Sequence, residues 1–235
     1  MRDSFSLFER LHYQHRFWRY SRRTEPDTIH FIRAELQAGQ TALDIGANKG
    51  VVTYFLARQV GPGGRVVAFE PQPEMNPLIR RMARSFGLEN VSVETLGLSD
   101  HEGQVSLFRG KAGTTGNLEA NRSWQCEEIP ISITTLDHYV ATRERFPIHF
   151  IKCDVDDHES KVLAGAADVL RTHRPKLLIE ISEENLGNIT EMLRCHGYNP
   201  GEFWFRGRRY PASESGNYPF RHAHARFRNF LFTAA

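Results

Sequence analysis

Acidic residues and glycines in the first third of the chain have the spacing of a nucleotide-binding turn. Asp44, Gly46 and Gly50 follow an apolar stretch that is typical of the end of a buried strand, and residues 51–60 have the pattern of a helix. A strand, a turn and a helix bring unpaired backbone N–H groups and a positive dipole end to one point. A second apolar stretch ends in Glu70, 26 positions after Asp44. Nucleotide-binding folds place an acid against ribose hydroxyls after a gap of roughly 20 residues.

Two cofactors could use this geometry, NAD and S-adenosylmethionine. A dinucleotide site has the pattern G-x-G-x-x-G, whose middle glycine admits a pyrophosphate. This chain instead has Asp44-x-Gly46-x-x-x-Gly50, with Asn48 between the glycines. The acid would repel a pyrophosphate, whereas it would attract an amino group and a sulfonium. The turn therefore favours S-adenosylmethionine. NAD, and a glycine turn that merely closes a strand–helix unit, are the alternatives.

Length and composition indicate one large soluble domain. The chain has 235 residues, of which 40% are hydrophobic and 25% charged, and it can bury a sizeable core. Its three cysteines cannot all pair in disulfide bonds, and they form no C-x-x-C motif. We therefore expect reduced thiols. We find no signal peptide and no run of ~18 apolar residues. These features predict a cytoplasmic protein that neither is exported nor spans a membrane.

The two ends of the chain are basic and rich in aromatic residues. Residues 1–33 carry seven Arg against four acids, and residues 201–235 carry six Arg against two, so the middle of the chain is acidic. Such ends could contact nucleic acid, an anionic lipid surface or a phosphate-bearing substrate. The simpler interpretation is that Arg stems cover apolar surface while their charged groups stay in water.

Strands and helices are expected to alternate along most of the chain, which predicts an α/β fold. Two extra strands, one with Val105 and Leu107 and one with Ile129, Ile131 and Ile133, are expected to form an antiparallel ribbon. The glycine-rich residues 110–117 between them are a candidate lid or substrate loop. The alternating phenylalanines near 203–205 and 230–232 predict a final antiparallel pair.

Four carboxylates should gather at one edge of this sheet. Asp44, Glu70, Asp154 and Glu180 each lie near the carboxyl end of an expected strand, and alternation puts Lys152 on the same face as Asp154. Such a gathering is costly unless positive charge lies among the acids. A sulfonium with its amino group would supply that charge, and so would a divalent metal. The carboxylate oxygens of Asp154 and Glu180 are ligands of the type that Mg²⁺ accepts, although we do not expect a metal.

Several motifs, in this order, resemble the FkbM family of S-adenosylmethionine-dependent O-methyltransferases. The resemblance covers residues 42–181. It rests on DIGANKG (44–50), FEPQP (69–73), GLSDHEG (97–103), FIKCDVDDHE (150–159) and KLLIEI (176–181). The first motif occurs in methyltransferases generally, whereas the ordered set is specific.

The resemblance implies a fold and a reaction. The fold is a Rossmann-like class I methyltransferase, a seven-stranded mostly parallel sheet with one antiparallel strand and helices on both faces. The reaction is O-methylation of a hydroxyl on a sugar, polyketide or related natural product. We expect residues 1–40 to form a helical extension that caps the acceptor side. Residues 41–235 would form the methyltransferase domain, with the ribbon and loop inserted at about 103–135.

The resemblance also implies which residues bind S-adenosyl-L-methionine. Asp44, Gly46 and Asn48 would surround its methionine part, and Glu70 would hold both ribose hydroxyls. Leu98 and Ser99 would lie beside the adenine. The neighbouring motif positions that we assign to the same site are Ala47, Gly50 and Pro71.

The catalytic residues are expected just after the fourth core strand. Asp154 would face the reacting centre, and Asp154 or His158 would accept the proton of the acceptor hydroxyl, His158 being better matched to neutral pH. We include Lys152 in the catalytic set. Family members usually have glycine where this chain has Asp157, and an Asp can adopt the left-handed backbone conformation that glycine would supply.

The acceptor is expected to be a small molecule with a hydroxyl group. The basic ends favour a phosphate-bearing or carrier-bound acceptor, and free sugars and polyketides are the alternatives. Enzymes that methylate nucleic-acid bases carry an Asn/Asp-Pro-Pro-aromatic turn after the fourth strand, where this chain has Asp154-Val155-Asp156. We therefore expect no nucleic acid. The alternatives are a nucleic-acid or carboxyl methyltransferase and a non-catalytic cofactor-binding domain, and a homo-oligomer remains open.

Overall fold

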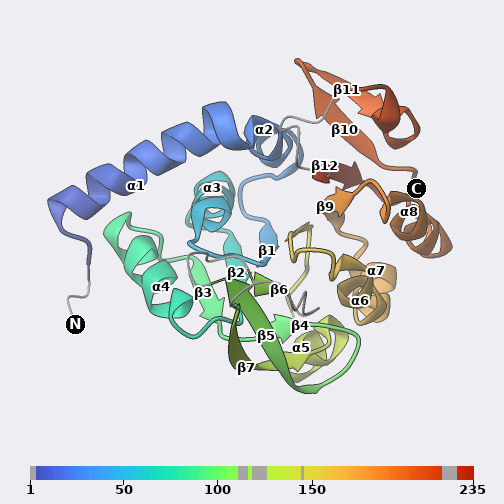
Figure 1. Cartoon of the computed structure of the whole chain (residues 1–235). Coiled ribbons are helices and arrows are strands. Elements are labelled where there is room, and N and C mark those ends of the chain that lie inside the picture. Colours follow the sequence, from blue (N-terminus) through green and yellow to red (C-terminus); the bar gives the residue numbers. More distant parts are fainter. Residues whose placement is uncertain (1–3, 111–115, 118–125, 144–145, 219–226) are drawn as a thin grey trace.

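An eight-stranded sheet forms the middle layer of the protein (Figure 1). The computed structural model describes residues 4–110, 116–117, 126–143, 146–218 and 227–235. The strand order is β11-β10-β12-β9-β8-β1-β2-β3, with β1 between β2 and β8. The five strands that run parallel are β1 (Thr41–Ile45), β2 (Arg65–Phe69), β3 (Val91–Glu94), β8 (Phe150–Cys153) and β9 (Lys176–Ser182). Their carboxyl ends therefore meet at one edge.

Three C-terminal strands extend the sheet beyond β9. β12 (Phe227–Phe232) runs antiparallel to β9, and β10 (Glu202–Phe205) pairs with β12 through Phe203 and Phe230, which confirms the predicted final pair. The α/β class with helices on both faces is also confirmed. The sheet has an eighth strand, β11 (Arg208–Pro211), so two strands rather than one run in the reverse direction. This edge strand is half-buried at most and lacks the apolar alternation that marks a strand in a sequence.

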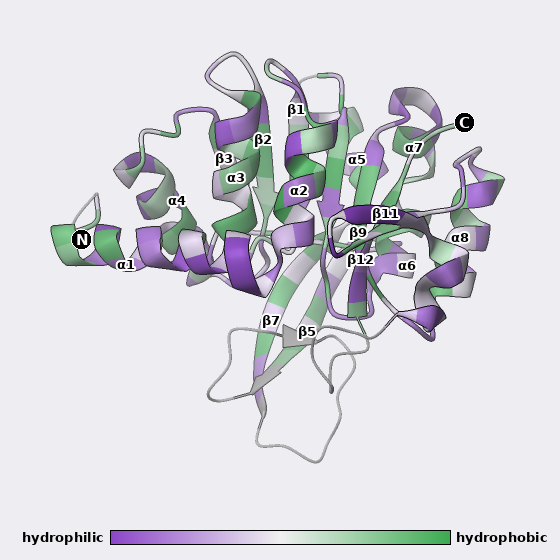
Figure 2. Ribbon diagram, turned by 90° about the horizontal axis from the view of Figure 1, so that it is seen from above, coloured by the Kyte–Doolittle hydropathy of each residue, from purple (hydrophilic) through white to green (hydrophobic). Residues whose placement is uncertain are grey.

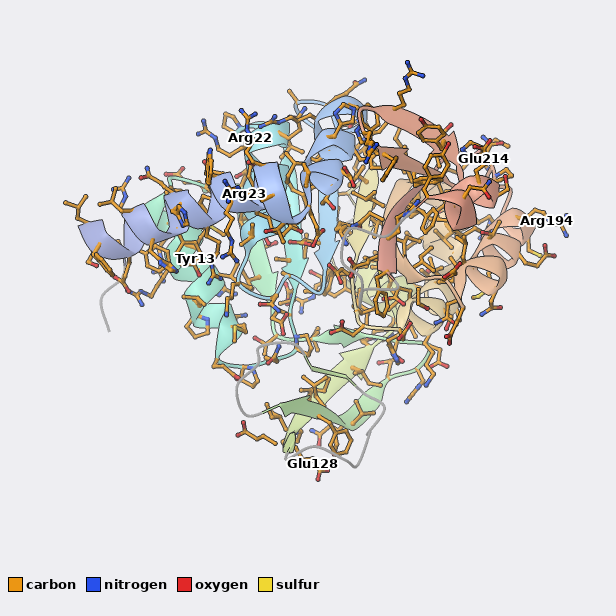
Figure 3. All side chains as sticks on the ribbon, turned by 45° about the horizontal axis from the view of Figure 1, so that its top comes forward. Tyr13, Arg22, Arg23, Glu128, Arg194 and Glu214 are labelled. Carbon is orange, nitrogen blue, oxygen red and sulfur yellow. The ribbon has the colours of Figure 1, made fainter. Side chains whose placement is uncertain are left out.

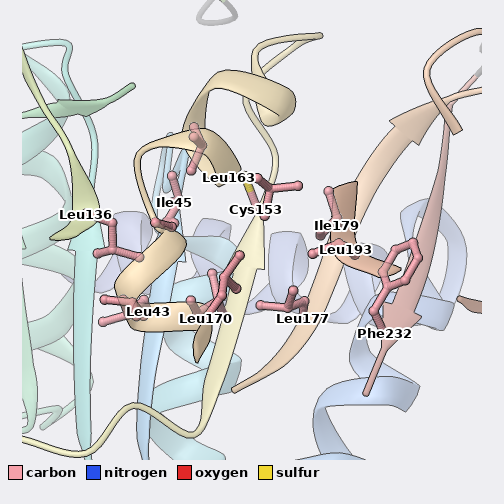
Figure 4. Packing of buried hydrophobic residues seen from close by; sticks show 14 of the residues in the cluster. Leu43, Ile45, Leu136, Cys153, Leu163, Leu170, Leu177, Ile179, Leu193 and Phe232 are labelled. Atoms are coloured by element: carbon pink, nitrogen blue, oxygen red, sulfur yellow. The ribbon is translucent and has the colours of Figure 1, made fainter. Parts of the chain in front are cut away.

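Helices cover both faces of the sheet, and residues of β1 alternate between the two cores. Ala42 packs with the helices of one face, whereas Leu43 and Ile45 pack with those of the other. Figure 4 shows Leu43 and Ile45 within the second of these cores. The elements on the first face are α1 (Leu7–Arg19), the π-helical η1 (Tyr20–Thr24), α2 (Pro26–Glu35), α3 (Val51–Val60) and α4 (Met75–Ser85). Those on the second face are α5 (Leu136–Thr142), α6 (Glu159–Ala164), α7 (Ala167–His173) and α8 (Leu186–Cys195). The short 3-10 helix η2 (Ala212–Asn217) follows β11.

Two short helices, α6 and α7, follow β8, although the spacing of Val162, Leu163, Ala166, Val169 and Leu170 is typical of one continuous helix. Gly165 separates them. A Cβ on Gly165 would lie 2.0 Å from the carbonyl oxygen of Ser99, so the chain passes too close to that backbone for a side chain. The break thus follows from a tertiary contact that periodicity cannot reveal.

A second, four-stranded sheet is inserted between β3 and α5. Its order is β4-β7-β5-β6, and the predicted ribbon is confirmed by antiparallel pairing from Gly103 opposite Ile133 to Gly110 opposite Cys126. The strands are β4 (Gly97–Leu98), β5 (Gly103–Gly110), β6 (Gly116–Asn117) and β7 (Cys126–Thr134). Figure 2 shows β5 and β7 projecting from the main sheet. Of the candidate lid, residues 111–115 lie outside the described residues.

Candidate active site

A cavity lies where β1, β2 and β8 end and where the inserted ribbon meets them. It has an empty volume of about 610 Å³, part of it open to solvent. Open α/β sheets bind their ligands at this edge. The residues that line the cavity are Ile45, Gly46, Asn48, Phe69, Glu70, Pro71, Gln72, Leu96, Gly97, Leu98, Leu107, Ile131, Asp154, Val155, Asp156 and His158.

Both glycines of the turn after β1 have a positive φ, which favours glycine. Gly46 has φ +85°, and a Cβ there would lie 1.9 Å from the carbonyl oxygen of Asp154. Gly50 caps α3 with φ +76°, and its Cβ would lie 2.7 Å from Cε of Met82. At Gly46 the backbone that follows β8 also leaves no room for a side chain.

Glu70 presents a buried carboxylate to the cavity. Its Oε2 accepts a hydrogen bond from the backbone N–H of Asn48 at 2.7 Å. Its Oε1 accepts from the backbone N–H and the side-chain amide of Gln72, at 3.0 and 3.1 Å. Burial raises the pKa of Glu70, and these hydrogen bonds oppose the rise. The carboxylate is therefore fixed in place, with lone pairs left for hydroxyl donors.

The other residues predicted to bind a cofactor divide into two groups. Gly46, Asn48, Pro71 and Leu98 line the cavity with Glu70, whereas Asp44, Ala47, Gly50 and Ser99 do not. The carboxylate of Asp44 lies behind the wall, where Oγ1 of Thr53 donates to it at 2.5 Å. Burial raises the pKa of Asp44 to about 6, and the Thr53 hydrogen bond and Lys152 limit that rise. Asp44 can act on a ligand in the cavity through its charge.

Lys152 supplies positive charge among the carboxylates of this edge. Its side chain is fully buried, and its Nζ lies 3.2 Å from Oδ2 of Asp154. Burial alone would lower the pKa of Lys152, but Asp154 and Glu180 raise it above its usual value. Burial and the negative charge of Asp154 raise the pKa of Glu180 to about 9, so Glu180 carries a proton at neutral pH. Lys152 itself does not line the cavity.

The segment before β1 contributes Glu25 to this group, which we call the acid cluster: Glu25, Asp154 and Glu180. One carboxylate oxygen from each lies within 4.8 Å of the others. Oε2 of Glu25 accepts from the hydroxyl of Tyr20 at 2.8 Å and from the side-chain amide of Asn229 at 3.3 Å. The sequence analysis missed Glu25, because no local pattern links the start of a helix to strand ends far along the chain.

His158 lines the cavity, but it contacts Ser99. Its Nε2 lies 3.0 Å from Oγ of Ser99, which in turn donates to Oδ1 of Asp100 at 3.1 Å. Because the Ser99 hydroxyl uses its proton on Asp100, Nε2 of His158 acts as the donor in this pair. Ser99, which we predicted beside the adenine, and His158, which we predicted as a base, thus hold each other in place.

Two successive residues after Asp154 have a left-handed backbone. Asp156 has φ +51° and Asp157 has φ +72°. The expectation that Asp157 adopts the conformation of the usual glycine is confirmed, and its Oδ1 accepts from the side chain of Asn185 at 3.0 Å. Glu159 closes the loop, because its Oε1 accepts from the backbone N–H of Val155 at 3.1 Å.

Two apolar residues of the cavity wall come from the inserted ribbon. Leu107 of β5 and Ile131 of β7 are buried, and they pack together with Ile133 in a small cluster of their own. From the sequence we predicted the ribbon, and a role as lid or substrate loop for the residues between its strands, but no role in the site for the strands themselves. The strand alternation could have identified the inward-facing residues, but not the surface that they meet.

A family model described as "Methyltransferase FkbM domain" matches residues 44–200. The chain belongs to this family. It is therefore an S-adenosylmethionine-dependent methyltransferase, as the resemblance implied. Among curated relatives, the 31-O-demethyl-FK506 methyltransferase FkbM of Streptomyces tacrolimicus is 27% identical over 195 residues, which cover 70% of this chain and 74% of that one.

Solved structures of methyltransferases share the fold of this FkbM-family chain. Methyltransferase FkbM from Methylobacillus flagellatus matches with a TM-score of 0.56 and 15% identity over 87% of this chain. The chain spans about half, 50%, of that crystallised chain. A putative methyltransferase from Streptococcus mutans in complex with SAH matches with a TM-score of 0.52 and 11% identity, covering 88% of this chain and 96% of that chain.

The cavity residues suit the methyl donor of this enzyme class. A fixed carboxylate on Glu70 can accept hydrogen bonds from neighbouring hydroxyls, as on a ribose. Leu98, Leu107 and Ile131 give the same cavity an apolar wall, which a flat base could contact. Asp154 adds negative charge, from which a sulfonium would gain.

Proposed function

We propose that this FkbM-family protein transfers the methyl group of S-adenosylmethionine to a hydroxyl oxygen of a small natural-product or sugar intermediate. The observation that carries the proposal is that Glu70 and Asp154 line the same cavity, while Lys152 pairs with Asp154 from the buried side. When bound, the donor would supply an activated methyl group at a sulfonium. The chain would position the acceptor and remove its proton.

Glu70, Asn48 and the apolar ribbon residues would hold the donor. Glu70 would accept hydrogen bonds from both ribose hydroxyls, while Leu98 and Leu107 contact the adenine. Holding donor and acceptor in line can supply roughly 7–11 kcal/mol of the barrier for such a displacement. Positioning by these residues would thus lower the activation barrier more than general-base catalysis does.

Asp154 is the base that this geometry favours. It lines the cavity, and its side chain is 29% exposed, so an acceptor can reach it. Lys152 holds the carboxylate in place from the buried side. A general base contributes roughly 10²–10⁴ in rate, which an alcohol needs because its proton must leave. His158 is the weaker candidate, because its Nε2 is engaged by Ser99. We assign Lys152 a positioning role.

The acceptor side of the site would be formed in part by residues 1–40. Glu25 of this segment belongs to the acid cluster with Asp154, and the hydroxyl of Tyr20 donates to Glu25. Their hydroxyl and carboxylate could orient the polar groups of a polyhydroxylated acceptor. This supports an acceptor with several hydroxyls over a flat nucleobase, which would need an apolar or aromatic slot.

Transfer of a labelled methyl group to a panel of acceptors tests the proposal. The panel contains glycosides, nucleotide-linked sugars, carrier-bound acyl groups and RNA. We expect label in a hydroxyl-bearing small molecule or carrier-bound group, and at least about hundredfold less label with Asp154→Asn. Label in RNA or in carboxyl groups alone would contradict O-methylation of a small molecule. Equal transfer by the Asp154→Asn variant would remove Asp154 from the role of base.

A further inference from the structure

Helix α1 has two apolar faces, and only one of them is buried. Tyr13 and Phe17 pack against the body of the protein, where Phe17 stacks on Tyr54 of α3 with ring centroids 3.8 Å apart. On the outer side, Leu7 is 76% exposed, Phe8 80%, Leu11 55% and Trp18 50%. These are the large hydrophobic residues that the described part of the chain exposes. Large exposed apolar residues gathered in one place call for an explanation.

The exposed apolar residues lie on one side of α1, with Leu7, Phe8 and Leu11 together near its start and Trp18 two turns beyond Leu11, past the polar Gln14. Leu7, Leu11 and Trp18 have the i, i+4, i+11 spacing that places side chains on one face, and Phe8 lies next to them. At 100° per residue, this face lies roughly opposite Tyr13. Figure 2 shows the hydrophobic first turn of α1 at the outer end of the molecule, and Figure 3 shows Tyr13 with Arg22 and Arg23 further along.

Arginines accompany these apolar residues. Residues 7–24 contain five arginines and a single acid, Glu9. Arg10 lies over the ring of Phe86 and Arg16 over that of Tyr13, so these two lie towards the packed side of the helix, whereas Arg19, Arg22 and Arg23 are exposed. Glu9 does not offset them on the outer face, because it caps the helix start and pairs with Arg81 of α4 at 3.0 Å. Arg23 lies over the ring of Trp18, 5.5 Å from its centroid. The segment therefore combines apolar side chains with uncompensated positive charge.

We propose that the outer face of α1, defined by Leu7, Phe8, Leu11 and Trp18 with the flanking arginines, docks on an anionic phospholipid bilayer. A helix that lies in a membrane interface carries Trp, Phe and Leu on one face and basic residues beside them. The described residues contain no helix that could cross a bilayer, so the contact is a surface one. The proposal does not depend on the proposed function.

Charge complementarity favours an anionic lipid bilayer over a second copy of the chain and over RNA. A second copy of the chain would bring the same arginines against one another across a two-fold axis, which like charges disfavour. An RNA strand would use the arginines, but the aliphatic Leu7 and Leu11 offer no face on which a base can stack. An anionic bilayer uses both features, because phosphates attract the arginines and the acyl boundary takes the apolar side chains.

Vesicle flotation of the full chain tests this inference. Vesicles of phosphatidylcholine alone are compared with vesicles that contain about one-third phosphatidylglycerol. We expect at least about tenfold more protein to float with the anionic vesicles, and less at 0.5 M salt because salt screens the attraction. Arg19→Glu/Arg22→Glu should lower flotation about tenfold or more, and Leu11→Ser/Trp18→Ser should do the same.

The matched control is Arg171→Glu/Arg194→Glu, which changes the net charge equally on α7 and α8, where both arginines are exposed. This control should float like the wild type. All the substitutions alter exposed side chains, so melting temperatures should stay close to that of the wild type. Absence of flotation with anionic vesicles would overturn the proposal, as would an equal loss in the control. A dimer that Leu11→Ser/Trp18→Ser dissociates, without vesicle binding, would assign the face to a second copy instead.

Discussion

The buried ammonium of Lys152 lies 3.2 Å from Oδ2 of Asp154, at the end of β8. Strand alternation places the two side chains on one face, and the neighbouring strands bring further carboxylates to the same edge. Their mutual repulsion is therefore offset by a cation that the chain itself provides. From the sequence we named a sulfonium with its amino group, or a divalent metal, as sources of that positive charge.

Removal of this buried cation should be costly. We expect Lys152→Met to lower the free energy of unfolding by roughly 3–5 kcal/mol, because it leaves the carboxylates without their partner. Adding Asp154→Asn should recover part of this loss, since the pair acts together. Urea unfolding measures both effects. The control is Lys176→Met, whose half-exposed pair with Glu35 should contribute about 1 kcal/mol or less. Equal losses at the two lysines would contradict the role of Lys152.

Stability should fall as the pH rises from about 5 to 8. Burial raises the pKa of Glu159 to about 7 and those of Asp44 and Asp156 to about 6, each above its value in the unfolded chain. The folded state then binds more protons than the unfolded state, so ionisation through this window weakens it. Glu159 alone corresponds to about 3 kcal/mol.

Thermal melting between pH 5 and pH 8.5 checks this prediction. Glu159→Gln should flatten part of the decline, because the amide oxygen can still accept from the Val155 N–H. Glu191→Gln, at an exposed carboxylate whose pKa is lowered by Arg194, should leave the decline unchanged. A melting temperature that rises steadily towards pH 8 would show that these acids are not buried as described.

The left-handed backbone at Asp157 gives a prediction about a single residue. With φ at +72°, a β-branched side chain is strained here, so Asp157→Val should lose roughly 1–3 kcal/mol. Asp157→Gly should retain or raise stability, because glycine adopts this conformation freely and only one exposed hydrogen bond is lost. Melting temperatures of the two variants test whether residue 157 has this left-handed backbone. Similar values for both would mean that the loop takes another path.

Chelation tests whether a divalent metal takes part in turnover. Glu25, Asp154 and Glu180 lie close enough to ligate one ion, but Lys152 already neutralises charge there and Glu180 holds a proton. A protonated carboxyl is a poor ligand. We therefore expect methyl transfer to continue at an unchanged rate after EDTA treatment. Loss of turnover that Mg²⁺ restores would establish a metal in the acid cluster.

The motifs revealed more of the fold than of the site. Alternation and periodicity predicted the parallel strands, the ribbon and the antiparallel pair of Phe203 and Phe230, because each is encoded over a few consecutive residues. The break at Gly165 and the edge strand β11 were not predictable in this way, since a distant backbone or a sheet edge imposes them. In the site, Glu70 and Asp154 could be predicted from the motifs that contain them. Glu25 was not, because only the folded chain brings it to the acid cluster.

Cofactor binding by two variants tests the central claim most directly. Calorimetry measures the dissociation constant of S-adenosylhomocysteine for the wild type, Glu70→Gln and Asp154→Asn. We expect Glu70→Gln to weaken binding by about tenfold to hundredfold, because it removes a charged hydrogen-bond acceptor for the ribose. Asp154→Asn should bind within about threefold of the wild type while losing turnover. The account would be contradicted if Glu70→Gln bound S-adenosylhomocysteine as tightly as the wild type. It would also be contradicted if both variants lost the same affinity, because Glu70 would then not bind the cofactor separately from the catalytic role of Asp154.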